Sequence, residues 1–262
     1  MRLEYSVFSA HKSDLAPETF EDSYFPIEDF SSSLLVPAKF AVADGASEAL
    51  LSGKFADIAV HSFGVSEHSE LDFQTLLKLI HMTWEKWKLE EYLPSRQREG
   101  RPIKWYEEQG LADGAFCAFL GLIFLSPVNL ASGFWKAVAI GDSCLFQVRD
   151  GKLLRSFPLR ESSSFDSRPF LISSNPIKNE NILARVRKIF GTWVRNDIIF
   201  LMTDALALWF IKQHEAGNRP WEILSLFGPK TPKSAFYDFV RDLRSSALIR
   251  NDDTTLMKLA LL

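Results

Sequence analysis

Short stretches of the chain are apolar throughout or alternate between apolar and polar residues, and both patterns predict β-strands. Residues 1–10 alternate loosely, whereas residues 115–125 are apolar almost without interruption. An apolar run of this length predicts a strand that is buried on both faces. On these grounds we predict strands at residues 1–10, 34–43, 115–125, 134–149, 152–157, 197–202 and 253–261.

Other segments repeat their apolar residues every three or four positions, which predicts helices with one buried face. In the clearest of them Phe73, Leu76 and Ile80 recur at this spacing, and Trp84 and Trp87 continue the same face. We interpret both tryptophans as core anchors rather than as the walls of a ligand slot. We predict helices at residues 48–63, 71–89, 205–214 and 234–246.

The remaining segments are polar or contain proline, glycine and serine, which predicts loops. We predict loops at residues 12–20, 94–102 and 160–181, and a hairpin turn at residues 150–151. Strands and helices come in blocks, which favours an α+β fold with antiparallel sheets over a doubly wound α/β fold. Neither an internal repeat nor a linker divides the sequence, so we expect one domain over residues 1–262.

The composition allows a large core and argues against two classes of partner. Hydrophobic residues make up 47% of the 262 positions, and the formal net charge is −3. Because nucleic-acid binders usually carry a basic excess, we expect no nucleic-acid partner. The start of the chain lacks the apolar core of a signal peptide, and the longest apolar stretch is too short to cross a bilayer. We therefore expect a cytoplasmic protein without a membrane partner.

The cysteines and histidines offer no separate chemistry. Cys117 and Cys144 both lie in apolar runs, which predicts two buried thiols rather than a disulfide. The cysteines and histidines do not have the spacing of zinc ligands. The five histidines also show no paired spacing with carboxylates, and we interpret them as surface or helix-face residues.

Three aspartates stand at the ends of predicted strands. Asp44 follows the second of these strands, Asp204 comes just after the sixth, and Asp252 directly precedes the last. Carboxylates that converge at the ends of buried strands repel one another unless a cation neutralises them, and hard oxygen ligands select Mg²⁺ or Mn²⁺. Taken singly, each aspartate is better explained as a turn or cap residue, so the sequence context has to decide.

Six short motifs flank the predicted strands in a fixed order. The most specific combines Gly-Asp-Ser at residues 141–143 with Arg-Asp-Gly-Lys at residues 149–152. The six motifs lie at residues 20–23, 42–45, 114–116, 139–153, 201–204 and 251–255. As an ordered set that covers the whole chain, they resemble the type 2C family of metal-dependent Ser/Thr protein phosphatases. The resemblance implies a four-layer αββα sandwich of two antiparallel sheets flanked by helices.

The resemblance also implies a dinuclear metal site. Asp44 would bridge two Mn²⁺ or Mg²⁺ ions, and the carbonyl group of Gly45 would bind one of them. Asp204 and Asp252 would complete the ligands of the first ion, and Asp22 would act near the metals through water.

Two further residues have alternative interpretations. Asp142 either binds a weaker third cation, as the resemblance implies, or is a structural residue of the hairpin. The family often holds the substrate phosphate with an N-terminal arginine, but the predicted loop at residues 12–20 has none. Lys12 is the candidate substitute, a point charge without bidentate geometry, and a solvated loop lysine is the alternative. Asp253 would support its neighbour Asp252.

The sequence departs from the family's pattern at other places as well. Ala205 follows Asp204 where the family usually has glycine, and Ala46 stands where some members have a histidine proposed as a general acid. Residues 159–182 lack the family's motifs, and in the family this region forms a flap that shapes access to the site. These differences concern substrate choice and rate more than the metal ligands.

The function implied by the resemblance is hydrolysis of phosphoserine and phosphothreonine in proteins, by water activated between two cations. A phosphoprotein substrate and a cognate Ser/Thr kinase would be the partners. The alternative is a catalytically weak or inactive regulator that keeps the fold and binds a kinase or a phosphoprotein, and Ala205 and the missing arginine motivate it. A two-metal nuclease is disfavoured because the sequence shows no basic, aromatic surface pattern.

Overall fold

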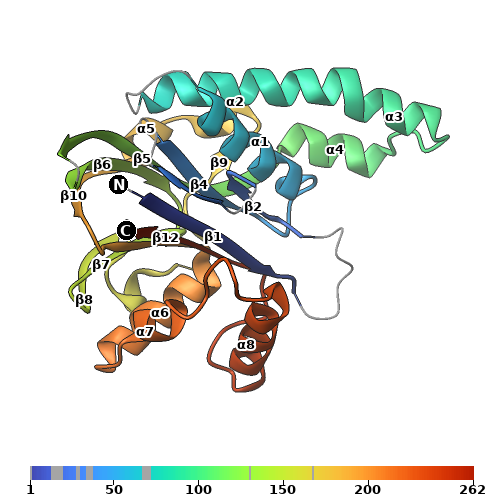
Figure 1. Ribbon diagram of the computed structural model, residues 1–262. Helices are drawn as coiled ribbons and strands as arrows, with labels where there is room; N and C mark the ends of the chain where they lie inside the picture. Colours follow the sequence, from blue (N-terminus) through green and yellow to red (C-terminus); the bar gives the residue numbers. More distant parts are fainter. Residues whose placement is uncertain are drawn as a thin grey trace.

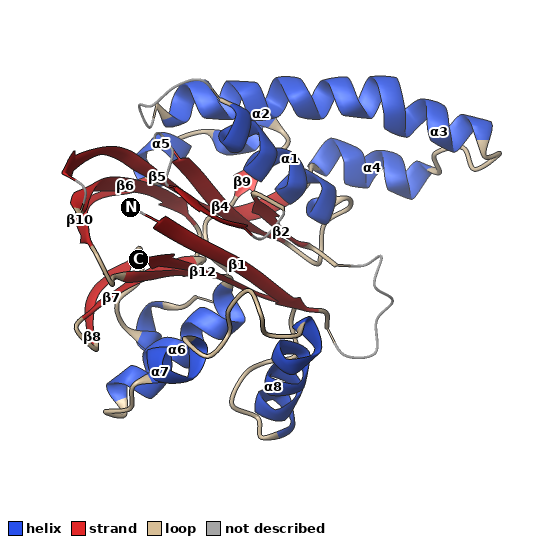
Figure 2. Cartoon of the chain, viewed as in Figure 1, coloured by secondary structure: helices blue, strands red, loops and turns tan. Residues whose placement is uncertain are grey.

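The molecule consists of two antiparallel sheets that face each other, with helices covering the outer face of each (Figures 1 and 2). The computed structural model describes residues 2–12, 20–27, 30–33, 38–66, 72–129, 131–166 and 168–262. This arrangement confirms the prediction of an α+β fold with four αββα layers. Because each sheet is covered on both faces, its strands have the continuous apolar runs seen in the sequence.

The first sheet has six strands in the order β3-β1-β12-β11-β7-β8. The first and last strands of the chain pair along their whole length, from Leu3 opposite Leu261 to Ala10 opposite Thr254. The N-terminal segment is therefore held beside the C-terminal one at the centre of the sheet. The bounds are β1 (Arg2–Ala10), β3 (Phe30–Ser33), β7 (Cys144–Arg149), β8 (Lys152–Phe157), β11 (Ile198–Met202) and β12 (Thr254–Leu261).

The second sheet has the order β10-β6-β5-β4-β2, with the short β9 paired to β5. The pairing of β2 with β4 sets Asp22 directly opposite Asp44. Two of the predicted acidic motifs thus become neighbours. The bounds are β2 (Asp22–Phe25), β4 (Ala38–Gly45), β5 (Phe116–Asn129), β6 (Ser132–Ile140), β9 (Ile172–Ser173) and β10 (Arg187–Val194).

The helices form the two outer layers. On the side of the second sheet are α1 (Ser52–Val65), α2 (Phe73–Trp87), α3 (Leu93–Arg98), α4 (Trp105–Asp113) and α5 (Ile182–Arg185). On the side of the first sheet are α6 (Asp204–Glu215), α7 (Pro220–Leu224) and α8 (Lys233–Ser245). A π-helical turn, Lys88–Tyr92, joins α2 to α3, and two short 3₁₀ turns, Ser162–Ser164 and Pro176–Asn179, lie in the long segment after β8.

Three apolar clusters hold the layers together, one between the sheets and one under each helical layer. Trp135 and Trp193 are completely buried between the sheets. Trp84 is 2% exposed and packs edge-on against Phe55, which confirms it as a core residue. Trp87 lies beside Trp84 but is only half-buried, at the margin of the same cluster. Both cysteines are free and buried, as predicted. Burial raises the pKa of each thiol, so neither is a ready nucleophile.

Most element predictions hold, and the differences have local causes. The loop predicted at residues 94–102 is wrong at its start, because Pro94 lies in the first turn of α3, where its missing N–H costs nothing. The predicted strand at residues 134–149 is two strands, since Gly141 has a φ of 92° and ends β6. Part of the strand predicted at residues 34–43 lies outside the described residues.

Several elements had no prediction, notably β2, β10, α4 and α7. α4 has no buried residue and so carries no helical apolar stripe. β10 lies at the edge of its sheet, and Trp193 is its only fully buried residue. Their sequences therefore lack the periodic apolar signal on which the predictions depend. No helix in the described ranges has the length and apolarity needed to span a bilayer.

Candidate metal centre

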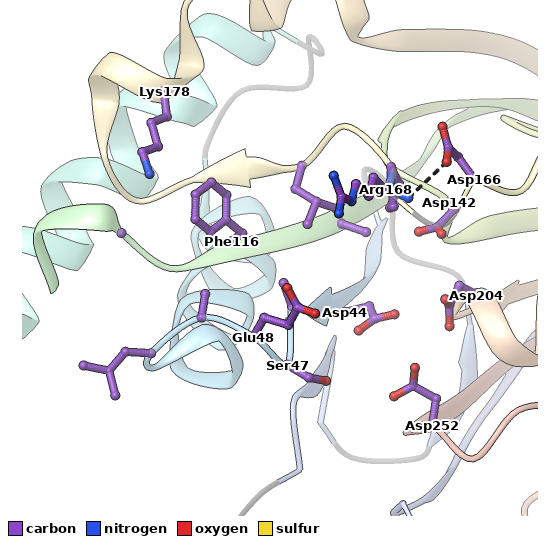
Figure 3. Close-up of a pocket in the computed structure, with 18 of the residues that line it drawn as sticks. Asp44, Ser47, Glu48, Phe116, Asp142, Asp166, Arg168, Lys178, Asp204 and Asp252 are labelled. Atoms are coloured by element: carbon purple, nitrogen blue, oxygen red, sulfur yellow. Dashed lines mark hydrogen bonds between the residues drawn. The ribbon is translucent and has the colours of Figure 1, made fainter. Parts of the chain in front are cut away.

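A pocket of about 780 Å³ opens where the ends of the two sheets meet. Asp44, Gly45, Asp142, Asp204 and Asp252 all line it. Figure 3 shows the four aspartate side chains around a common space, although they come from segments far apart in the sequence. The structure thus brings together most of the site residues predicted from the sequence.

Each of these aspartates is positioned by the end of a strand or helix. Asp44 lies near the end of β4, and Asp142 is in the turn between β6 and β7. Asp204 is the first residue of α6, where a carboxylate is favoured by the helix dipole. Asp252 directly precedes the short segment that leads into β12. Two strands of the second sheet and two of the first therefore supply the site together.

Gly45 allows the start of α1 to lie against the end of β4. A Cβ atom on Gly45 would be 2.7 Å from the backbone carbonyl carbon of Ser52. No real side chain fits at that distance, so any other residue would push α1 away from the pocket. The sequence motif requires glycine here for this steric reason.

Asp22 lies beneath the pocket rather than in its lining. It is 4% exposed, and its Oδ2 accepts hydrogen bonds from Thr203 Oγ1 at 3.0 Å and Thr255 Oγ1 at 2.7 Å. Its Oδ1 is buried and has no hydrogen-bond partner within the described part of the chain. Asp22 therefore links β2 to β12 and to the residue that follows β11, and its Oδ1 remains available to a further donor or cation.

Burial, and after it the nearness of other carboxylates, raises the pKa of Asp44, Asp22 and Asp142. Burial, and then the neighbouring charges of Asp22, Asp142 and Asp252, raise the pKa of Asp44 well above its usual value. Burial raises the pKa of Asp22 to about 8 against the two threonine hydrogen bonds, and it raises that of Asp142 to about 6. Negative charge in this pocket is under-compensated by the protein itself, which is the condition in which a cation binds.

Arg250 is the main site residue that the sequence analysis missed. Its guanidinium forms an ion pair with Oδ2 of Asp204, and its Nε lies 3.6 Å from Oδ2 of Asp252. Arg250 is exposed and lines the pocket. The available signal was its place two residues before Asp252, but an arginine in a loop is usually a solvated residue.

Lys12 lies beside Asp252, at the edge of the aspartates, but does not line the pocket. Its Nζ is 2.6 Å from Glu21 and 3.3 Å from Asp252, and it also hydrogen-bonds Ser47. Asp253 holds this edge in place, because its two oxygens accept hydrogen bonds from the backbone N–H groups of Lys12 and Glu21, each at 2.7 Å. The N-terminal and C-terminal motifs are thus joined directly.

The donor chemistry of the pocket fits a hard divalent cation. All the candidate side-chain ligands are carboxylates, and Oδ1 of Asp204 is buried without a hydrogen-bond partner in the described residues. Among the described residues, no three His, Cys, Asp or Glu side chains stand close enough together to hold one ion. Arg250 contacts both Asp204 and Asp252, so a bound cation would compete with its guanidinium for these two carboxylates.

Ala205 does not disturb the site. It is the second residue of α6, is 3% exposed and packs in the helical layer. The backbone here is helical, a conformation that alanine favours over glycine. The alanine that departs from the family's pattern is therefore compatible with the position of Asp204.

Comparison with known proteins identifies the fold. No protein-family model and no curated protein matches the chain. The catalytic domain of the serine threonine protein phosphatase PstP, solved with two manganese ions, is 13% identical with a TM-score of 0.55, over 99% of this chain and 98% of that one. The Mycobacterium tuberculosis phosphatase PstP/Ppp is 15% identical with a TM-score of 0.57, over 100% and 99%. The photosystem II phosphatase PBCP is 15% identical with a TM-score of 0.56, over 99% of each chain. The chain has the fold of these Ser/Thr phosphatases along its whole length.

Proposed function

We propose that this protein is a metal-dependent phosphatase that removes phosphate from phosphoserine and phosphothreonine in proteins. The observation that carries the proposal is the convergence of Asp44, Asp204 and Asp252 from both sheets on one pocket. The shared fold supports it, because PstP and PBCP are phosphatases of this fold. The partners would be phosphoproteins and the Ser/Thr kinase that modifies them.

The proposed ligand roles follow the positions of the carboxylates. Asp44 and the carbonyl group of Gly45 would contact two Mn²⁺ or Mg²⁺ ions, with Asp204 and Asp252 on the first ion. Asp142, which also lines the pocket, would hold a third. When bound, such ions lower the pKa of water and neutralise charge on the phosphoryl oxygens.

The chain's own residues would orient the substrate and protect the site. Arg250 is placed to bind the phosphoryl group, since a guanidinium matches its oxygens with two parallel hydrogen bonds. The role predicted for Lys12 remains a prediction, and its ion pair with Glu21 keeps it 3.3 Å from Asp252. Asp22 would stay beneath the pocket and hold β2 against β12 and the residue after β11 through its two threonine partners.

The alternative function is a regulator that binds phosphoproteins without turnover. The observation that favours it is the pairing of Arg250 with Asp204 and Asp252, which partly neutralises the site without a metal. In a phosphatase, cations displace this guanidinium from the carboxylates and hydrolysis follows. In a regulator, phosphoproteins bind but are not hydrolysed.

The experiment that separates them is hydrolysis of p-nitrophenyl phosphate and of a phosphothreonine peptide in EDTA, Mg²⁺ or Mn²⁺. Asp44→Asn and Asp204→Asn should abolish metal-dependent turnover, while Asp57→Asn on α1, outside the pocket lining, serves as the matched control. Turnover that neither pocket substitution affects would show that the site is elsewhere. A folded protein that binds Mn²⁺ and phosphopeptide but never turns over would establish the regulator.

A further inference from the structure

A second cavity, of about 880 Å³, adjoins the aspartate pocket. The two share Asp142, Asp166, Arg168 and Pro169 in their walls. Figure 3 shows Arg168, Asp166 and Asp142 in the aspartate pocket, and the same three residues also line the second cavity. The two cavities therefore lie side by side, with these four residues in the walls of both.

The walls of this cavity are rich in cationic side chains from four separate segments. We define the basic groove by five exposed residues, namely Arg160, Arg168, Arg185, Arg187 and Lys188. They come from the loop after β8, the loop before β9, the end of α5 and the start of β10. Apart from Asp142 of the aspartate pocket, Glu161 and Asp166 are the carboxylates in the same walls.

The arginines of the basic groove are not neutralised by the protein. In the described part of the chain, Arg160, Arg168, Arg185 and Arg187 form no ion pair, whereas some exposed arginines elsewhere do. Arg219, for example, pairs with Glu222 at 3.2 Å. Since the whole chain has a net charge of −3, this local excess is not a general basicity of the surface.

The walls of the groove also include apolar side chains. The guanidinium of Arg185 lies over the ring of Phe170, 5.2 Å from its centre, and both residues line the cavity. Such stacking leaves the edge N–H groups of an arginine available to an anion. Phe157 and Ile189 add apolar surface to the same walls. A peptide that carries both acidic and apolar side chains matches this combination.

Resting on the proposed function, we propose that the basic groove binds acidic side chains that flank the phosphorylated residue of the substrate. The protein then prefers phosphoproteins with aspartate or glutamate beside the phosphoserine or phosphothreonine. A peptide fits better than a nucleic acid, because Glu161 and Asp166 would repel a continuous line of phosphates. The groove thus sets substrate choice, and the aspartate pocket performs the chemistry.

The test compares two phosphothreonine peptides that differ only in their flanks, one with glutamates and one with glutamines. The groove variant is Arg160→Gln with Arg185→Gln and Arg187→Gln, which leaves Arg168 and the aspartate pocket intact. Arg98→Gln, on the exposed α3, is the matched control. The value of kcat/KM is measured for both peptides, and their binding is measured in EDTA by fluorescence anisotropy. p-Nitrophenyl phosphate, which has no flanking residues, serves as the control substrate.

We expect the glutamate peptide to be preferred about tenfold by the natural protein, as three exposed charge pairs allow. The groove variant should lose this preference while its hydrolysis of p-nitrophenyl phosphate stays unchanged, and added salt should weaken the preference. Arg98→Gln should keep it.

The outcomes separate this inference from the proposed function. Turnover with equal kcat/KM on both peptides overturns the groove assignment and leaves the phosphatase intact. No turnover, together with anisotropy that still favours the glutamate peptide and depends on the groove arginines, supports the groove and refutes the phosphatase. A labelled oligonucleotide that binds through the groove when neither peptide does would overturn the assignment in favour of nucleic acid.

Discussion

Arg250 shows how one side chain changes the interpretation of a site. The three aspartates at strand ends predict a cation, and in the structure a guanidinium already contacts two of them. An arginine beside carboxylates neutralises them only in part, because Asp44 keeps a raised pKa despite the opposing charge of Arg250. A divalent cation bound by Asp204 and Asp252 would therefore compete with Arg250 for these carboxylates.

Substitution of Arg250 tests this competition. We expect Arg250→Ala to tighten Mn²⁺ binding several-fold, because no guanidinium has to leave the carboxylates. The same variant should raise KM for a phosphopeptide about tenfold, the value of a charge-assisted hydrogen-bond pair. Titration calorimetry measures the first effect without any turnover. Weaker Mn²⁺ binding by Arg250→Ala would contradict the competition, and Arg250→Lys should restore part of the phosphate contact only.

Metal binding should also stabilise the fold, because the carboxylates of the pocket repel one another without it. At a Mn²⁺ concentration about 100 times the dissociation constant, the gain is about 2.7 kcal/mol. For a chain of this size that corresponds to a rise in Tm of about 5–10 °C, measured by calorimetry against EDTA. Asp44→Asn should remove most of the rise, and Asp57→Asn should retain it. An equal rise in both variants would mean that Mn²⁺ binds elsewhere.

At the scale of elements, β6 and β10 fit together because each strand places a tryptophan opposite a glycine of the other. Trp135 on β6 lies opposite Gly191 on β10, and Trp193 on β10 lies opposite Gly133 on β6. In each pair the indole covers the glycine, so that a Cβ there would overlap the ring. This reciprocal packing explains how the edge strand β10 is held although little of it is buried.

Gly191→Ala is the direct test of that packing. The added methyl group forces the indole of Trp135 to move within a closed core, so we expect a loss of about 1–3 kcal/mol in the free energy of unfolding. Gly110→Ala, inside α4, is the control, because its nearest neighbour would be Leu50 at an ordinary 3.4 Å and alanine favours the helix. Urea unfolding of both variants measures the difference. Equal stability of the two would mean that Trp135 has room to shift.

At the scale of the whole molecule, the first and last strands of the described chain, β1 and β12, pair with each other in the first sheet. β12 lies between β1 and β11, and the backbones of Arg2 and Leu262 exchange two hydrogen bonds, at 3.1 and 2.8 Å. The first sheet therefore depends on β12, the last strand of the described chain, for the pairing of both β1 and β11. Loss of that strand would expose the central positions of the sheet and remove the partner of both β1 and β11.

Two rearranged chains test this dependence. Deletion of residues 254–262 should abolish cooperative unfolding, because the deleted strand is central. A circular permutant that joins Leu262 to Arg2 through a short linker, with new ends at the exposed Gly100 and Arg101, should fold and keep its metal-dependent stabilisation. Circular dichroism during heating distinguishes the two. A cooperative transition in the deletion variant would show that β12 is dispensable.

The sequence by itself determined the parts of this protein that local patterns encode. Continuous apolar runs predicted the buried strands, and Asp44, Asp204 and Asp252 stand at the ends of three of them. Taken singly these aspartates could be turn or cap residues, and the order of the six motifs along the chain made them candidate site residues. Segments with little burial, such as α4 and β10, carried no such pattern. Only the tertiary structure decided which charges meet. The contact of Arg250 with Asp204, the pairing of Lys12 with Glu21 and the gathering of Arg160 with Arg187 join distant segments or depend on how a loop folds back. Such contacts follow from the packing of the two sheets and their loops, which no local periodicity records.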